Sequence, residues 1–371
     1  MTRALTDIRR IVVKVGSSVL TGGGITLDMP IVEQLCGELA ALSKLGREVC
    51  LVTSGAIALG RGRLGLRERP RTIPMKQAAA AVGQAILMRR YEEMLAPHGI
   101  APAQILLTHA DLADRRRFLN ARHALLALWE LKALPVINEN DSVSIEEIQV
   151  GDNDRLSAQV ASLCNADLLI LLTDIDGLFD QDPRADPSAK RIAECDDLAF
   201  AERAAGGAGT QIGTGGMATK IAAARIAGAA GVPTIVAQGR EPHVLERLLA
   251  GDDLGTRFVA DKKKKSARKH WIAHTLRPIG AIVIDAGAAL AIGQGGRSLL
   301  PAGIVEVRGA FDIGDAVSVI GPDGIERARG IVQYTHDQLR RIAGKRGAQI
   351  AEILGDSLGD EAIHRDDLVL L

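Results

Sequence analysis

The sequence predicts an α/β protein with an open, mainly parallel sheet sandwiched by helices, followed by a small β-rich domain. Short apolar strand-like segments alternate with helix-like segments over about 250 residues, the pattern of a parallel sheet covered on both faces. Hydrophobic residues make up 47% of the chain but aromatics only 2%, so the core must consist of Ala, Leu, Ile and Val. After residue 279, short strands and glycine turns replace the alternation.

The predicted elements of the first domain follow from apolar runs and their capping residues. Strands are expected at 11–15, 48–53, 103–107, 134–137, 167–172 and 233–237. Helices are expected at 28–45, 74–96, 115–132, 155–164, 221–230 and 241–249, with Asp28 as an N-cap, Gly46 as a helix end and Pro74 at a helix start. Strands of the second domain are expected at 281–284, 304–307, 316–319 and 327–332.

The length of 371 residues favours two domains. We predict a catalytic domain at 1–260, a charged linker at 261–278, and a β-rich domain with the C-terminal tail at 279–371. Residues 261–270 contain six basic residues and one acid, which we interpret as a solvated linker rather than a nucleic-acid patch.

Charge and cysteine usage exclude several classes of protein. The formal net charge is zero, which argues against a general nucleic-acid or membrane-surface binder. The four cysteines, Cys36, Cys50, Cys164 and Cys195, have no CxxC spacing, so we expect no zinc site and no disulfide framework. We therefore expect a cytoplasmic protein, with no signal peptide and no membrane helix.

The most informative segment is the glycine-rich loop at 209–220, which runs into an alanine-rich helix. The backbone N–H groups of such a loop can converge on phosphate oxygens beside the positive end of a helix dipole. It is not a Walker A loop, because Thr219 rather than glycine precedes Lys220. We interpret it as a nucleotide-phosphate loop outside the P-loop families; a flexible surface loop is the alternative.

Polar residues also follow the other predicted strands. Lys14, Ser54, the segment 138–141 and the pair Thr173-Asp174 all stand at strand ends, where parallel sheets bind ligands. Phosphoryl transfer requires positioning and positive charge, which Lys14 and Lys220 can supply from opposite sides. For either lysine alone, a solvated surface charge is the alternative.

Two short acidic and amide-rich segments suggest the acceptor. Residues 138–141 read Asn-Glu-Asn-Asp and residues 151–154 read Gly-Asp-Asn-Asp. Their amides and carboxylates suit a small molecule with an ammonium and a carboxylate, and an acid between two lysines would hold both in place. Taken alone, 151–154 is equally explained as a turn with an N-cap.

The chain resembles the glutamate 5-kinase family of the amino acid kinase superfamily. The segments that carry the resemblance are 14–18, 52–56, 136–141, 150–154, 172–174 and 213–220. Segments 298–304 and 309–315 resemble the PUA domain of many bacterial members. The resemblance covers essentially the whole chain.

The resemblance implies ATP-dependent phosphorylation of the γ-carboxylate of L-glutamate, the first step of proline synthesis. It implies that Lys14 and Lys220 stabilise the migrating phosphoryl group and that Asp154 orients both lysines. Glutamate would be bound by Ser54, Asp141 and Asn153, with Asn138 and Asp152 lining the same pocket. ATP would be held by Thr173, Asp174, Thr214, Gly215, Gly216, Met217, Ala218, Thr219 and Lys220.

The resemblance also implies Mg²⁺ carried with the nucleotide, with no metal site of the protein's own. We expect proline to inhibit by competing with glutamate near 140–154, and the chain to form a homo-oligomer.

Two alternative functions remain at this stage: another carboxylate or carbamate kinase of the same superfamily, and an RNA-binding PUA protein. Residues 279–371 contain nine Lys/Arg and thirteen Asp/Glu, the wrong sign for binding phosphate backbones. The basic residues Arg340, Arg341, Lys345 and Arg346, in a predicted helix, keep the RNA alternative open.

Overall fold

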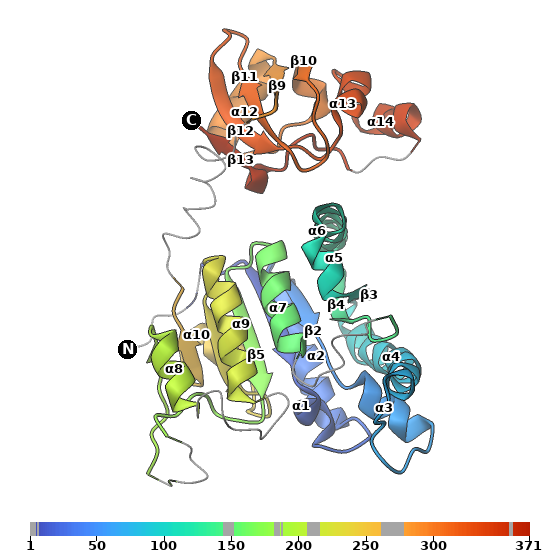
Figure 1. Ribbon diagram of the computed structural model, residues 1–371, viewed down its shortest axis with the longest axis vertical. Helices are drawn as coiled ribbons and strands as arrows, with labels where there is room; N and C mark the ends of the chain where they lie inside the picture. Colours follow the sequence, from blue (N-terminus) through green and yellow to red (C-terminus); the bar gives the residue numbers. More distant parts are fainter. Residues whose placement is uncertain are drawn as a thin grey trace. The chain divides into compact units, whose positions relative to one another are not determined.

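The computed structural model describes residue 5 and residues 7–143, 152–181, 186, 188–205, 216–260, 278–355 and 359–371. The chain divides into two compact units, which are treated separately: residues 1–113 with 124–261, and residues 114–123 with 262–371. The ribbon of the first unit is a sheet covered by helices, and that of the second is smaller and richer in strands (Figure 1).

The first unit is built on an eight-stranded sheet in the order β3-β4-β2-β1-β5-β7-β8-β6. The strands are β1 (Arg10–Val15), β2 (Glu48–Val52), β3 (Pro102–Leu107), β4 (Leu134–Glu139), β5 (Leu168–Thr173), β6 (Glu194–Cys195), β7 (Thr234–Gln238) and β8 (Thr256–Phe258). All neighbours are parallel except β7 and β8. The predicted open, mainly parallel sheet is therefore confirmed.

Helices cover both faces of this sheet. The helices up to β8 are α1 (Ser17–Thr21), α2 (Met29–Lys44), α3 (Ala56–Arg63), α4 (Ile73–Leu95), α5 (His109–Ala113), α6 (Arg115–Glu130), α7 (Asp152–Leu163), α8 (Leu198–Ala204), α9 (Met217–Ala229) and α10 (Val244–Ala250); residues 115–123 of α6 belong to the second unit. Helices α2, α4 and α10 pack on the face of Ile11 and Val13. Helices α7 and α9 lie side by side over the sheet (Figure 1), and α7 packs against β1.

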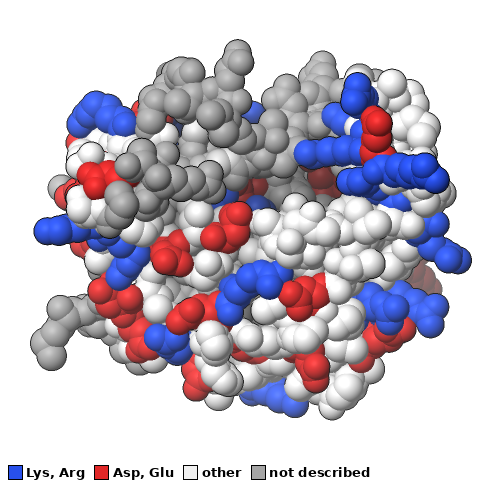
Figure 2. Space-filling view, turned by 90° about the horizontal axis from the view of Figure 1, so that it is seen from below, with Lys and Arg blue, Asp and Glu red and all other residues white. Residues whose placement is uncertain are grey.

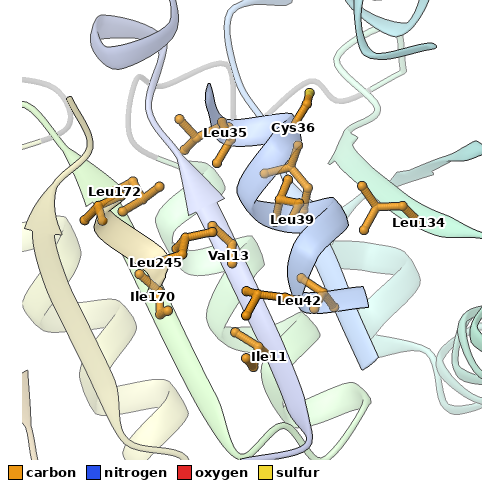
Figure 3. Close-up of a cluster of buried hydrophobic side chains, with 14 of the residues drawn as sticks. Ile11, Val13, Leu35, Cys36, Leu39, Leu42, Leu134, Ile170, Leu172 and Leu245 are labelled. Carbon is orange, nitrogen blue, oxygen red and sulfur yellow. The ribbon is translucent and has the colours of Figure 1, made fainter. Parts of the chain in front are cut away.

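Aliphatic side chains fill the core between α2 and the central strands. Leu35, Leu39 and Leu42 extend from α2 toward Ile11 and Val13 of β1 (Figure 3). Burial of each such side chain contributes about 1.5–3 kcal/mol. Because side chains alternate along a strand, Lys14 lies on the opposite face from Val13, beneath α7.

Helices α3 and α4 cross at glycines that allow their backbones to touch. A Cβ atom on Gly83 would lie 1.7 Å from the carbonyl oxygen of Ala56, and one on Gly60 would lie 1.8 Å from that of Ala79. Glycine is the one residue that fits at either position. The sequence pattern did not predict α3, yet this crossing fixes the chain directly after Ser54.

The second unit contains a five-stranded sheet in the order β10-β9-β11-β12-β13. Its elements are β9 (Gly280–Ile284), α12 (Ala286–Gly295), β10 (Ile304–Gly309), β11 (Ala316–Ile320), β12 (Glu326–Ile331), α13 (His336–Ile342), α14 (Gly347–Leu354) and β13 (Leu368–Leu370). The small β-rich domain is thus confirmed. A capping box at Thr335 begins α13.

The prediction that one helix contains Arg340, Arg341, Lys345 and Arg346 was wrong. Helix α13 contains Arg340 and Arg341 but ends at Ile342, and Gly344 follows with a φ of +75°. The backbone leaves the helical conformation at Ala343, which has a ψ of 130°, before Gly344. Lys345 and Arg346 therefore precede α14.

Positive and negative side chains intermingle on the face seen in Figure 2, in keeping with the zero net charge. Among the helices in the described ranges, none is both long and apolar enough to cross a membrane.

The α3–α4 crossing yields a first prediction. Gly83→Ala should lower the free energy of unfolding by about 1–3 kcal/mol, because the added methyl group meets a carbonyl oxygen of the facing helix. Gly37→Ala in α2 is the matched control: its Cβ meets nothing within 4 Å, so helix propensity should leave stability unchanged or raise it by up to about 1 kcal/mol. Urea denaturation of both variants measures the difference. Equal stabilities would contradict the close crossing.

Candidate active site

Polar residues line up along the carboxyl ends of four adjacent strands. The order β4-β2-β1-β5 brings Asn138, Ser54, Lys14 and Thr173 into one row. The chain runs from β1 to β2 on one side and reaches β5 on the other, so β1 marks the point where the strand order reverses. Open α/β sheets bind ligands at such a point. Lys14 stands there, between the amide-bearing strands and β5.

A buried carboxylate joins two lysines at this point. Asp154, in the first turn of α7, is 0% exposed. Its Oδ1 lies 2.5 Å from Nζ of Lys14, and its Oδ2 lies 3.3 Å from Nζ of Lys220. The Thr219 hydroxyl donates to Oδ2 at 2.7 Å. One carboxylate therefore holds two ammonium groups from separate elements, β1 and α9.

Charge balance in this triad favours an anion. Within the three described side chains of the triad, one carboxylate charge on Asp154 is shared between two ammonium charges. Asp174 also acts on Lys220, but it is exposed, where water screens its charge. Both lysines are almost fully buried, which strengthens their attraction for a negatively charged group beside them.

The pKa values follow from burial and from these contacts. Burial alone would raise the pKa of Asp154, but Lys14 and Lys220 outweigh it and hold that pKa below the ordinary value. Burial lowers the pKa of Lys220, and Lys14 lowers it further, although Asp154 opposes both. Asp154 is thus an anion at neutral pH and is unsuited to accept a proton as a base.

Amide side chains form a second cluster, on the β2 and β4 side. The Asn153 Nδ2 group donates to the Thr53 carbonyl at 2.8 Å, to the Ser54 hydroxyl at 2.9 Å and to Asn138 Oδ1 at 3.0 Å. Asn138 in turn donates to Oε1 of Gln84 on α4 at 2.8 Å. Because Asn153 and Asp154 are adjacent in α7, this cluster lies beside the lysine triad.

Helix α9 begins earlier than the sequence predicts. The expected start was Ile221, and that was wrong: α9 starts at Met217, after Gly216 in an extended conformation. Lys220 therefore lies in the first turn, where helix N–H groups favour anions. The glycine run obscured this boundary because Gly216 serves as the N-cap.

The β5 and β7 ends form the side opposite to the amides. The Thr173 hydroxyl donates to Asp174 Oδ1 at 3.0 Å, and Gln238 Nε2 donates to the Asp174 carbonyl at 3.2 Å. Within the described residues, the buried Gln238 Oε1 has no hydrogen-bond partner. An orphaned acceptor at this depth suits a ligand with N–H donors, such as an adenine base.

The structure places most of the sequence-predicted site residues together. Lys14, Lys220 and Asp154 meet in the triad, and Ser54, Asn138 and Asn153 meet in the amide cluster. Asp141 follows β4 by two residues. The backbone of Asp152 begins α7, but its side chain lies outside the described part, as do Thr214 and Gly215.

Sequence reasoning missed Gln84 and Gln238 and gave Thr219 only a nucleotide role, whereas its hydroxyl bonds Asp154. One signal for Gln84 was available: it is a lone amide in the otherwise small and apolar stretch 78–88.

The chain is similar to known proteins over nearly its whole length. The model of the amino acid kinase family matches residues 9–238, and the PUA domain model matches residues 280–354. A glutamate 5-kinase of Geobacter sulfurreducens is 51% identical over 99% of both chains. A glutamate 5-kinase of Burkholderia multivorans is 50% identical over the full length of both.

The chain belongs to the glutamate 5-kinase family of amino acid kinases.

Members of a kinase family use ATP with a divalent metal, so the site must be compatible with both. Among the described residues, no cluster of three or more His, Cys, Asp or Glu side chains is arranged to hold a metal ion. Asp154 is already occupied by two ammonium groups and a hydroxyl. A metal carried on the phosphates of the nucleotide needs few protein ligands, so this site is compatible with it.

The lowered pKa of Lys220 predicts the alkaline limit of activity. A lysine of lowered pKa loses its charge as pH rises through that value. As the pH is raised, kcat should therefore begin to decline before pH 10.5, the ordinary pKa of lysine, is reached. In Lys220→Arg the charge persists, so the remaining activity should decline at higher pH. Steady-state kcat measured from pH 6 to 11 tests this; a wild-type profile flat up to pH 10.5 would refute it.

Proposed function

We propose that the chain transfers the terminal phosphoryl group of ATP to the γ-carboxylate of L-glutamate, forming L-glutamyl 5-phosphate in the first step of proline biosynthesis. The observation that carries this proposal is the buried lysine–aspartate–lysine triad at the strand-order reversal. It separates an amide cluster on one side from a nucleotide-type strand end on the other.

The acceptor side suits an amino acid. Ser54, Asn138 and Asn153 are joined by hydrogen bonds, and we assign them, with Asp141 and Asp152, to glutamate binding. Amides can both donate and accept, so they can bind a carboxylate and an ammonium within one pocket.

The donor side suits a nucleotide. We assign Thr173, Asp174 and the segment 214–220 to ATP, with the first turn of α9 facing the phosphates. The orphaned acceptor on Gln238 supports an adenine-bearing ligand beside Asp174. Mg²⁺ would be bound mainly by the phosphates of the nucleotide.

The chemistry requires charge rather than a base. A carboxylate with an ordinary pKa of about 4.3 is already ionised at neutral pH, so it can attack phosphorus without losing a proton. A new oxygen–phosphorus bond forms while the bond to the leaving diphosphate oxygen breaks. Lys14 and Lys220 stabilise the charge spread over the migrating group, and Asp154 keeps both ammonium groups in position.

The rival functions have weaker support. Another carboxylate kinase is less favoured because the relatives that are 50–51% identical over nearly the whole chain are glutamate 5-kinases. For RNA binding, Arg340 and Arg341 are directed at carbonyl oxygens of their own unit, those of Val307, Gly309 and Ile353. We further propose a cytoplasmic homo-oligomer in which proline competes with glutamate near residues 140–154.

An acyl-phosphate trapping assay tests the substrate. With ATP and hydroxylamine, L-glutamate should give a hydroxamate, whereas aspartate and N-acetylglutamate should give none, because the pocket must match both the length and the free ammonium group. A hydroxamate from N-acetylglutamate or aspartate at a comparable rate would refute the proposed substrate.

Lys220→Ala should lower kcat by about 10²-fold or more, because a charged donor to the migrating group is lost. Lys190→Ala, an exposed lysine of the same unit, is the control and should keep its full rate. Circular dichroism confirms that both variants are folded. Near-normal turnover of Lys220→Ala would remove its assigned role.

A further inference from the structure

A buried glutamine on α4 extends the amide cluster beyond the residues assigned above. Gln84 is only 9% exposed, and its Oε1 accepts a hydrogen bond from Asn138 Nδ2 at 2.8 Å. Its Nε2 is buried and has no hydrogen-bond partner among the described residues. Leaving such a group unsatisfied is unfavourable, because it has lost its hydrogen bonds to water without gaining others. The neighbouring Gly83 brings this part of α4 against α3.

Backbone groups fix the direction of the amide chain. The Glu139 N–H, which can only donate, bonds Asn138 Oδ1 at 2.9 Å. The Thr53 carbonyl, which can only accept, bonds Asn153 Nδ2 at 2.8 Å. Rotating either asparagine amide would bring like groups together. Asn138 must therefore donate from its Nδ2 to Gln84, and Gln84 must accept with its Oε1.

Among the described residues, this fixed direction leaves one donor and one acceptor without a hydrogen-bond partner. The donor is Gln84 Nε2 at one end, and the acceptor is Asn153 Oδ1 at the other. An α-amino acid carries the complementary pair, since its carboxylate only accepts and its ammonium only donates. The two orphaned atoms thus match the backbone end of an amino-acid substrate.

We propose that Gln84 is a further specificity-determining residue, whose Nε2 donates to the α-carboxylate of the acceptor while Asn153 Oδ1 accepts from its ammonium. This inference rests on the proposed function. The α-carboxylate is chosen over the γ-carboxylate because Gln84 is bonded at β4, two strands from β1, where Lys14 stands. Two strand spacings are about 10 Å, which places Gln84 at the far end of the substrate.

The test is a change of substrate preference in Gln84→Glu. The Gln84→Glu side chain keeps one oxygen that can accept from Asn138, and it has a carboxylate oxygen in place of the Nε2 donor. The wild type should prefer L-glutamate to its α-amide, in which a carboxamide replaces the α-carboxylate. At pH 9 the variant's ratio of kcat/KM for the two substrates should fall at least tenfold, because the two carboxylates repel each other and the amide can donate. Burial and the substrate's α-carboxylate both raise the pKa of the new carboxyl group, so at pH 6 it should take up a proton and the ratio should recover.

Two further variants separate this role from simple support of Asn138. Gln84→Met removes the donor as well as the acceptor and should also lower the ratio; equal losses for both substrates would indicate a purely structural role and overturn the proposal. Gln104→Glu makes the same substitution at an exposed position of β3 and should leave the ratio unchanged. Melting temperatures confirm that each variant is folded.

The outcomes also distinguish this inference from the proposed function. If the wild type forms no hydroxamate with glutamate, the proposed function fails. If it does, but the Gln84→Glu ratio stays within threefold of wild type at both pH values, only the assignment of Gln84 is overturned.

Discussion

The ion pairs of Asp154 are the interaction on which the rest of the site depends. Two ammonium groups that would otherwise repel each other are held by one fully buried carboxylate, at the start of α7. Removing one member of a buried charge network costs about 3–5 kcal/mol, because the remaining charges lose their partner. Burial removes the three charges from water, which is unfavourable for folding. The same burial strengthens the electrostatic attraction of the two lysines for a bound anion.

The strand order places two different groups of polar residues on the two sides of the triad. Strand β1 carries Lys14 at the centre of the sheet, the amide cluster follows from β2 and β4, and the nucleotide-type residues follow from β5 and β7. Helix α7 bridges the two sides, since Asn153 bonds the amides and Asp154 bonds the lysines. A phosphoryl group passing from donor to acceptor would cross the sheet over β1.

Local sequence was enough to predict the parts of the site that lie at strand ends. The position of Lys14 in an apolar strand, and the residue types of the acidic segment 138–141, were enough to place these residues at strand ends. The sequence pattern did not predict the features of the site that depend on contacts between residues far apart in the chain. The place of Gln84 in the site depends on its hydrogen bond to Asn138 on β4, and the position of Thr219 depends on its hydrogen bond to Asp154. Contacts between residues so far apart in the chain leave no mark on hydrophobic periodicity.

The kcat of Asp154→Asn, compared with that of the double variant Lys14→Met/Lys220→Met, tests the account most directly. If one carboxylate positions both lysines, its loss should be nearly as harmful as the loss of both, with kcat at least about 10³-fold below wild type and within about tenfold of the double variant. An Asp154→Asn protein that is folded and turns over within tenfold of wild type would contradict the account, because the lysines would then hold their positions without it.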